Sequence, residues 1–381
     1  MRRGREWWRF RGQLSAISHQ PSAISFQSLG RIASSYELRA ANREPTLNMN
    51  ETFLAIINPE AGGGSCRERV GAALDRLRAA GIALETAETS AAGHATQIAR
   101  EGYGRGYRKF LAVGGDGTSY EIVNGLFPES GSQEGRSQEN RSQVSGVRSQ
   151  GVLAAEDQIE DRIPTLGFLP LGTGNSFLRD FEDGASGVRG LEHALEALEA
   201  RRSRPCDVMR LTHKDGAIYY TNLLSVGFAA DVAALRHRRF QGLGQFGYLL
   251  SIFLCLAWLD RRPFPVRVEG QGEFDSRRCL FLTFNNSKFT GGTMMIAPDA
   301  VTDDGLIEYV RWGPIGRLGL IRNLATLYDG THTRHPLAER QAVRRVEFQL
   351  DGPVDVMVDG EVLTLECRTI DVLPSALRVV V

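Results

Sequence analysis

Short apolar runs alternate with amphipathic stretches from Thr52 onward. The first three runs are FLAIIN (53–58), IALETAET (82–89) and KFLAVGG (109–115), and helical patterns lie after Ser65 and near 93–101. This alternation predicts a βαβαβ order and a parallel sheet. The helix after Ser65 carries its own boundary signals, because Ser65 and Glu68 form an S-x-x-E capping box and Gly81 follows the last periodic residue.

The pattern is interrupted between Glu129 and Arg162 and then resumes. The interruption contains GSQEGRSQENRSQVSGVRSQG, a degenerate R-S-Q repeat with almost no apolar residues. Such a segment cannot offset its ordering entropy, so we expect a solvated, low-complexity insert over 129–162. TLGFLPLGTGNSF (165–177) then predicts another strand, a glycine turn and a helix start, and LEHALEALEA (191–200) predicts a helix.

The character of the chain changes near Pro205. Strand-like runs now dominate: IYYTNLLSVGF (218–228), FPVRVEG (264–270), CLFLTFNNS (279–287), LIEYVRW (306–312) and VDVMVDGEVLTLE (354–366). Helices are expected near 244–260 and 315–329. We therefore predict an α/β domain with a parallel sheet over 49–204, a mostly antiparallel, β-rich domain over 205–366, and a final strand over 367–381 that returns to the first domain.

Length, composition and charge narrow the class of protein. The 381 residues are 42% hydrophobic and 24% charged, which is typical of a soluble globular chain of two or three domains. The 45 basic and 45 acidic residues cancel, so no nucleic-acid partner is expected. Five cysteines without a CxxC pair indicate reduced thiols and a cytoplasmic location.

Residues 1–48 resemble a transit peptide, with eight Arg, three Glu and many Ser. However, SAISHQ (15–20) is nearly repeated as SAISFQ (22–27), and Met49 stands just before a strong strand. We therefore interpret 1–48 as a disordered or artefactual extension.

The most apolar stretch, FGYLLSIFLCLAWL (246–259), is shorter than the roughly 20 residues of a membrane span. It predicts a buried or interfacial helix and no transmembrane span. Arg236, Arg238 and Arg239 precede it and fit two alternatives equally: a site for anionic lipid headgroups, or a solvated charge run. The pair His332 and His335 has no third ligand at a useful spacing, so we expect a surface pair.

Three glycine-rich turns each follow an apolar strand: Asn58-Pro59-Glu-Ala-Gly62-Gly-Gly64, Gly114-Gly115-Asp116-Gly117-Thr118 and Gly172-Thr173-Gly174-Asn175. The carboxyl ends of parallel strands converge on one crevice, where open α/β sheets bind ligands. Glycine allows close backbone approach, and helix N-termini favour anions. Thr118, Thr173 and Asn175 add polar partners, and Asp116 could meet a phosphate-bound Mg²⁺. We expect a nucleotide triphosphate here, although neither a P-loop nor a GxGxxG fingerprint is present.

Five segments in order, INPEAGGG (57–64), TSAAGHA (89–95), AVGGDGTSYEIVNGL (112–126), FLPLGTGNSFLRDF (168–181) and VDGE (358–361), resemble the diacylglycerol kinase catalytic-domain family. This family includes soluble bacterial diacylglycerol kinases and sphingosine and ceramide kinases. The resemblance covers about 52–381. It implies a NAD kinase-like nucleotide domain, a β-sandwich-like second domain and an active site in the cleft between them.

The resemblance also implies roles for individual residues. Asn58 to Gly62, Thr89, Gly115 to Glu121 and Thr173 would contact ATP. Asp359 would be the base that accepts the proton of the lipid hydroxyl, with Glu361 nearby. In APDAVTDDGLIE (297–308), Asp303, Asp304 and the Leu306 carbonyl would hold a structural Mg²⁺.

Two positions depart from the family pattern: Tyr120 replaces a usual Asn, and Ser176 replaces a common Asp. Without the other motifs, VDGE would be read simply as a hairpin turn, since Asp-Gly favours turns. We expect an ATP- and Mg²⁺-dependent kinase of diacylglycerol or a related lipid, bound peripherally at a membrane. A sphingoid base or ceramide kinase is the alternative enzyme, and a nucleotide-binding regulatory protein without turnover is the alternative of another class. A homodimer is left open.

Overall fold

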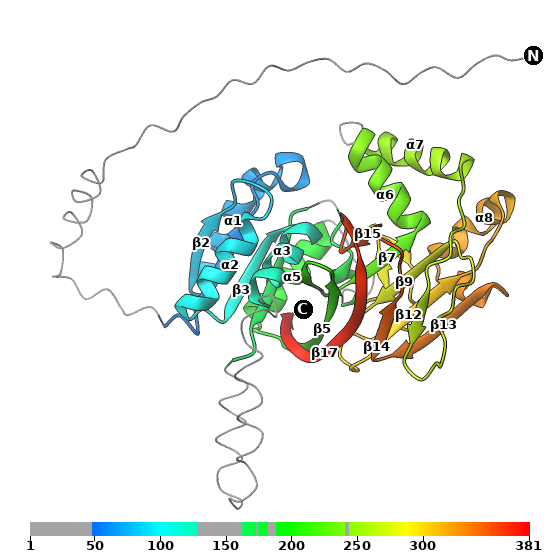
Figure 1. The fold of residues 1–381 in the computed structure, drawn as a ribbon. Coiled ribbons are helices and arrows are strands. Elements are labelled where there is room, and N and C mark those ends of the chain that lie inside the picture. The colour runs from blue at the N-terminus through cyan, green and yellow to red at the C-terminus, as the bar shows by residue number, and fades with distance from the viewer. Residues whose placement is uncertain (1–47, 128–161, 173, 182–187, 241–243) are drawn as a thin grey trace, which may run out of the picture. The chain divides into compact units, whose positions relative to one another are not determined.

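A computed structural model describes residues 48–127, 162–172, 174–181, 188–240 and 244–381, shown as a ribbon in Figure 1. The predicted extension (1–48) and the predicted insert (129–162) lie outside these residues, except for Asn48 and Arg162. The elements before residue 203 are β1 (Phe53–Ile57), η1 (Ala61–Gly64), α1 (Cys66–Ala79), β2 (Leu84–Glu88), α2 (His94–Arg105), β3 (Lys109–Gly114), α3 (Asp116–Leu126), β4 (Thr165–Pro170), η2 (Phe177–Asp180) and α5 (Val188–Glu199).

The elements from residue 203 onward are mostly strands. They are β5 (Ser203–His213), β6 (Gly216–Tyr220), β7 (Leu223–Gly227), α6 (Phe228–Arg239), α7 (Gly244–Ala257), β8 (Val266–Val268), β9 (Phe281–Asn285), β10 (Phe289–Thr290), β11 (Met294–Met295), β12 (Ile307–Trp312), α8 (Arg317–Asn323), η4 (Leu324–Leu327), η5 (Thr331–Arg334), β13 (Ala338–Val343), β14 (Arg345–Phe348), β15 (Val354–Val358), β16 (Glu361–Leu365) and β17 (Cys367–Val380).

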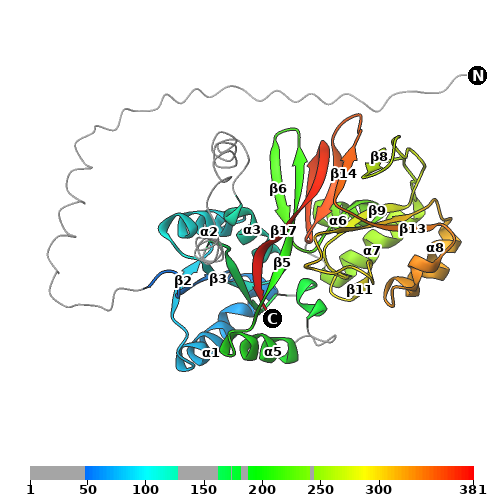
Figure 2. The ribbon, with the colours of Figure 1, turned by 90° about the horizontal axis from the view of Figure 1, so that it is seen from below.

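The N-terminal half is built on four parallel strands in the order β2-β1-β3-β4. Both faces of β1, β3 and β4 are buried, which explains their continuous apolar runs, whereas the edge strand β2 is partly exposed. In β1, Leu54 and Ile56 pack with α2 and α3, whereas Ala55 and Ile57 pack with α1 and α5. Figure 2 shows the two helix pairs on opposite sides of the sheet.

Strand β17 continues this sheet into the second half of the chain. Its end pairs in parallel with β4 at Arg378 and Val379, and most of its length pairs antiparallel with β5. The sheet has nine strands, since β14, β8 and β6 extend it further. The predicted boundary at 204/205 therefore lies within β5.

A second, six-stranded antiparallel sheet has the order β13-β12-β9-β7-β15-β16. One of its faces packs on β5, β6, β8, β14 and β17 around a core that includes Tyr220, Phe284 and Val356. Its other face, with Val310 and Trp312, is covered by residues of the α7 and α8 regions. The predicted fold class, a parallel α/β domain followed by an antiparallel sandwich-like domain, is confirmed.

Two local predictions were wrong. IYYTNLLSVGF does not form one strand, because the chain turns at Thr221 and Asn222 and passes from β6 in one sheet to β7 in the other. The capping box before α1 does not form either. Ser65 has helical dihedrals and its hydroxyl donates to the Gly62 carbonyl at 3.0 Å, so it makes no side-chain cap.

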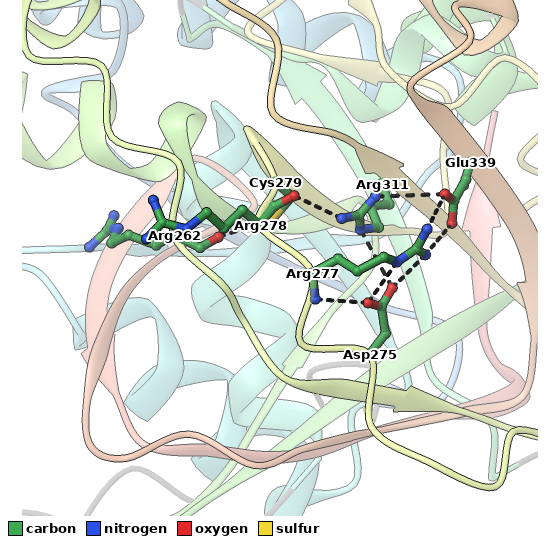
Figure 3. Close-up of polar contacts among 7 residues, drawn as sticks. All are labelled: Arg262, Asp275, Arg277, Arg278, Cys279, Arg311 and Glu339. Atoms are coloured by element: carbon green, nitrogen blue, oxygen red, sulfur yellow. Dashed lines mark hydrogen bonds and ion pairs between the residues drawn. The ribbon is translucent and has the colours of Figure 1, made fainter.

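An ion-pair cluster links β12 and β13 to the loop before β9 (Figure 3). Arg311 is almost fully buried and donates to the Arg278 carbonyl at 2.8 Å. Arg277 binds both Asp275 and Glu339, each at 2.7 Å. These arginine hydrogen bonds hold the pKa of Asp275 and Glu339 below their usual range. Two cations face two anions, so we interpret the cluster as structural.

Candidate active site

The three glycine-rich turns lie against one another at the carboxyl ends of β1, β3 and β4. A Cβ atom on Gly172 would stand 2.4 Å from the Gly115 Cα, and one on Gly62 would stand 2.6 Å from the Leu171 carbonyl oxygen. Only glycine permits approaches this close, since real Cβ contacts below 3.0 Å essentially do not occur. The turns therefore form one continuous backbone surface, a geometry suited to phosphate.

Hydrogen bonds hold the same turns in register. The Gly172 N–H donates to the Gly114 carbonyl at 2.8 Å. The Asn58 side chain reaches Thr118 Oγ1 at 3.4 Å, and the Asn175 amide donates to the Gly172 carbonyl at 3.1 Å. Asn175 is one of the non-glycine residues with positive φ, a conformation that asparagine tolerates.

Asp116 is the first residue of α3 and faces the third turn. Its Oδ2 accepts a hydrogen bond from the Ser176 N–H at 3.0 Å. A Cβ on Gly174 would lie only 2.8 Å from the same oxygen. Burial raises the pKa of Asp116 despite the hydrogen bonds from this segment. Asp116 thus ties the second and third turns together with a carboxylate at a helix N-terminus.

The other predicted nucleotide residues differ in what they do. Glu121 accepts hydrogen bonds from the Gly93 and Ala95 N–H groups at 2.8 and 3.0 Å, so its carboxylate caps the N-terminus of α2. The Thr89 N–H donates to the Ile57 carbonyl at 2.8 Å, directly before the first turn. Thr173 lies outside the described residues.

Asp359 and Gly360 form the turn of the β15–β16 hairpin, with φ of 47° and 92°. The Asp359 side chain is buried, and its carboxylate is bound by three backbone N–H groups. Oδ1 accepts from Asn222 and Leu223 at 3.1 and 2.9 Å, and Oδ2 accepts from Thr221 at 3.0 Å. Because a carboxylate offers about four acceptor sites, Oδ2 retains capacity for one further partner.

Burial and the nearby Asp116 carboxylate raise the pKa of Asp359 to about 7, although the three N–H donors oppose this rise. Asp116 thus lies close enough to Asp359 to affect its charge, which connects the hairpin to the glycine turns. Glu361 makes the same connection by contact: a Cβ on Gly117 would stand 2.7 Å from its Oε1. The hairpin turn and the N-terminus of α3 therefore share one site.

The turn formed by Asp303, Asp304 and Gly305 is held by Asp207, a fully buried residue on β5 that was not predicted from the sequence. Its two carboxylate oxygens accept hydrogen bonds from the Ser375 and Gly305 N–H groups at 2.7 and 2.6 Å. Asp304 accepts from the Leu306 N–H at 2.9 Å. Burial raises the pKa of Asp207, and the carboxylates of Asp304 and Asp303 nearby raise it further.

Two family models match adjacent parts of the chain. The model described as "Diacylglycerol kinase catalytic domain" matches residues 52–211, and the one described as "YegS C-terminal NAD kinase beta sandwich-like domain" matches residues 222–381. Residues 52–211 therefore match a diacylglycerol kinase catalytic domain, and residues 222–381 match the C-terminal domain found with it, which confirms the resemblance seen in the sequence.

Curated relatives agree with this assignment. The "Diacylglycerol kinase" of Bacillus subtilis is 27% identical over 333 residues, which cover 84% of this chain and 95% of the relative. A protein of Xanthomonas oryzae pv. oryzae named "Probable lipid kinase YegS-like" is 28% identical, with 82% and 90% covered. These matches support a lipid kinase that uses ATP, and they leave the acceptor open.

A solved structure supports the fold. The crystal structure of a diacylglycerol kinase from Bacillus anthracis superposes with a TM-score of 0.57 at 18% identity, covering 87% of this chain and 96% of the other.

The structure shows the surroundings of Tyr120 and Ser176, the two residues that depart from the family pattern. Tyr120 packs against the core between the two sheets, and burial, with Asp359 and Glu361 nearby, raises its pKa. The Ser176 hydroxyl accepts a hydrogen bond from the Gly292 N–H at 2.9 Å, so it connects the third turn to the β10–β11 segment. Serine thus supplies an acceptor oxygen at a position where the family commonly has a carboxylate.

Asp180, which was also not predicted from the sequence, similarly connects η2 to the residue before β10. Its Oδ2 accepts from the Lys288 N–H at 2.9 Å, whereas its buried Oδ1 has no partner among the described residues. Burial raises the pKa of Asp180 to about 6. No sequence signal marked Asp180 or Asp207, because each acts on backbone groups about 100 or more residues away.

The side chains of the described residues offer few ligands for a magnesium ion. Within the described ranges, no group of three or more His, Cys, Asp or Glu side chains is arranged to hold a metal ion. Mg²⁺ in kinases is typically bound by one or two carboxylates together with substrate phosphates and waters. Asp116 beside the glycine turns fits that mode, whereas the structural site predicted at Asp303, Asp304 and Leu306 stays a prediction.

His332 corrects another expectation. It is buried against Trp312, with ring centroids 5.6 Å apart, and its Nδ1 lies 3.2 Å from the Thr326 carbonyl oxygen. The predicted surface pair was therefore wrong for this residue. All five cysteines are unpaired, as expected. Among the residues with described structure, no helix combines the length and apolarity needed to cross a membrane.

Proposed function

We propose that this protein transfers the γ-phosphate of ATP to the free hydroxyl of diacylglycerol or a related lipid. The observation that carries the proposal is the Asp359 carboxylate. It is buried, it is oriented by three backbone N–H groups, and it lies in the same site as the glycine turns. A raised pKa near 7 matches a general base that works at neutral pH.

In this proposal the glycine turns bind the phosphates. Gly62, Gly114, Gly115, Gly172 and Gly174 allow the backbone to approach closely, and the N-terminus of α3 offers N–H donors and a partial positive charge. Asn58, Thr118 and Asn175 are candidates for hydrogen bonds to the nucleotide. When bound, Mg²⁺ would neutralise charge on the phosphates, with Asp116 as its candidate protein ligand.

The acceptor would be positioned by the β15–β16 hairpin. Oδ2 of Asp359 takes the proton of the lipid hydroxyl while the hydroxyl oxygen bonds to the γ-phosphorus and ADP leaves. Glu361 of β16, whose carboxylate lies beside Gly117 near the N-terminus of α3, is proposed to orient the acceptor or the transferring group. Asp303, Asp304 and the Leu306 carbonyl are proposed to hold a structural Mg²⁺ away from the chemistry.

The test is transfer of radiolabelled phosphate from ATP, with and without Mg²⁺, to diacylglycerol, monoacylglycerol, sphingosine and ceramide. Transfer to diacylglycerol is expected, with Asp359→Asn about 10²–10⁴-fold slower and nucleotide binding retained. A preference for sphingosine or ceramide would favour the alternative enzyme. ATP binding without transfer to any lipid would refute the kinase and favour a regulatory protein.

Nucleotide binding by Asp359→Asn is the control for folding. The exposed carboxylate of Asp351 offers a matched variant, because Asp351→Asn removes the same charge outside the site. If Asp359→Asn has the wild-type rate, Asp359 is not the base.

A further inference from the structure

The segment formed by α8 and η4 has both buried and exposed large apolar side chains. Leu320 and Leu327 point into the core beneath the six-stranded sheet. Four other large side chains of the segment are exposed: Leu318, Ile321, Leu324 and Tyr328. Their spacing of three, three and four residues places them along one side of a helical turn pattern. A helix that serves only to cover a core would carry polar residues there.

The end of α7 extends this exposed surface. Trp258 and Phe253 are 72% and 65% exposed, and Leu318 on α8 is 70% exposed. Arg317 fixes the two segments together, since its guanidinium donates to the carbonyls of Leu256 and Ala257 at 3.0 and 2.8 Å. Figures 1 and 2 show α7 and α8 on the same part of the second domain. We call Phe253, Trp258, Leu318, Ile321, Leu324 and Tyr328 the apolar patch.

The charges around the apolar patch are mostly positive. Residues 257–262 and 313–329, which carry most of the patch, contain four arginines (Arg261, Arg262, Arg317 and Arg322) and two acids (Asp260 and Asp329). Arg322 and Arg261 have no ion pair with any acid in the part of the chain that the structure describes. Exposed aromatic and aliphatic side chains next to unpaired arginines are the combination that binds anionic membrane surfaces.

We infer that the apolar patch docks on a lipid bilayer that contains anionic lipids. A second copy of this chain is the less suitable occupant, because a two-fold interface would place the same arginines opposite themselves. Anionic headgroups supply the opposite charge, and the acyl region accepts the aromatic and aliphatic side chains. This choice of partner rests in part on the proposed function, since a diacylglycerol acceptor resides in a membrane.

Helix α6 connects the docked segment to the site. It packs against α7 on one side and against β15 and β16 on the other. Arg238 of α6 binds Asp355 of β15 at 2.8 Å, and His237 of α6 is a neighbour of Glu361. Docking through α7 and α8 would therefore hold the hairpin that carries Asp359 at a fixed position relative to the bilayer.

The first experiment measures sedimentation of the full chain with vesicles of phosphatidylcholine and phosphatidylglycerol, without ATP or acceptor. The variant Phe253→Ser/Trp258→Ser/Leu318→Ser removes three exposed side chains and should bind about tenfold or more weakly, since each apolar group contributes to insertion. Met49→Ser is the matched control, because Met49 is an exposed apolar residue outside the apolar patch. Its binding should equal that of the wild type.

The second experiment separates insertion from charge attraction. Brominated acyl chains should quench Trp258 fluorescence, measured as the difference between wild type and Trp258→Phe. Arg261→Glu/Arg322→Glu should reduce binding to phosphatidylglycerol vesicles and leave binding to pure phosphatidylcholine vesicles nearly unchanged. Arg100→Glu, at an exposed site on α2, is the control for charge reversal.

Wild-type vesicle binding by the triple serine variant would overturn the inference. A second result would also overturn the inference: the wild type does not bind vesicles, and light scattering shows a dimer for the wild type and a monomer for the triple variant. That result would assign the patch to a second copy of the chain. Failure of the proposed function gives a different result, namely vesicle binding without phosphate transfer to any lipid. Turnover of a short-chain, water-soluble diacylglycerol should survive in the triple variant, because the patch lies outside the site.

Discussion

The buried Asp359 carboxylate should make the stability of this protein depend on pH, and Asp359→Asn should remove that dependence. Burial raises the pKa of Asp359 from 3.8 to about 7. Below about pH 4 the group is protonated in both the folded and the unfolded chain. Between about pH 4 and 7 the folded chain binds a proton that the unfolded chain releases, so the wild type loses stability as the pH rises through this window.

The expected magnitude follows from the pKa. A rise from 3.8 to about 7, at about 1.36 kcal/mol per pH unit, corresponds to about 4 kcal/mol. About 3 kcal/mol of this falls between pH 5 and pH 8. The amide variant adds a constant cost of about 1–3 kcal/mol, because its oxygen can serve Asn222 and Leu223 while its NH₂ group faces the Thr221 N–H.

The assay is urea unfolding of wild type and Asp359→Asn at pH 5 and pH 8, followed by fluorescence and circular dichroism. The difference in unfolding free energy between variant and wild type should move by about 3 kcal/mol in favour of the variant from pH 5 to pH 8. Asp351→Asn, which removes an exposed carboxylate, should show no such movement. A pH-independent difference for Asp359→Asn would refute a raised pKa at this residue.

Three further results are expected. The kcat/KM of the wild type should fall about tenfold per pH unit below about pH 7, as Asp359 becomes protonated; a profile flat down to pH 5 would exclude it as the base. Gly172→Ala should weaken nucleotide binding in calorimetry and cost about 1–3 kcal/mol of stability, because its Cβ would lie 2.4 Å from the Gly115 Cα, whereas Gly104→Ala, with no atom within 4 Å, should bind normally. Asp207→Ala should lower the thermal unfolding temperature, since two backbone N–H groups would lose a buried acceptor, at about 1–3 kcal/mol each; an unchanged melting curve would contradict this.

The strands and helices of the first domain were predicted well because the signal for each one lies within a short stretch of sequence. The short, continuous apolar runs at 53–58, 109–115 and 165–170 are typical of buried strands, and each is followed by a glycine turn at the same end of a parallel sheet. The contact between Gly172 and Gly115 is the physical result of that order.

The second domain was harder to predict, since its strands exchange sheets. Nothing in IYYTNLLSVGF shows that the chain turns at Thr221 and Asn222, because the N–H groups there are bound by the Asp359 carboxylate, more than 130 residues later. Likewise, Ser65 had a suitable sequence for a cap, but the preceding 3-10 turn used its hydroxyl.

The sequence by itself determined the strand-helix order, the three glycine turns and the acids at Asp359 and Asp116. Only the tertiary structure decided the burial and the hydrogen bonds of these acids. A carboxylate's pKa depends on its burial and on donors brought from distant strands, and neither quantity is encoded near it in the chain. The same holds for the apolar patch, because a periodic pattern of leucines cannot show which of its apolar side chains are covered by the core.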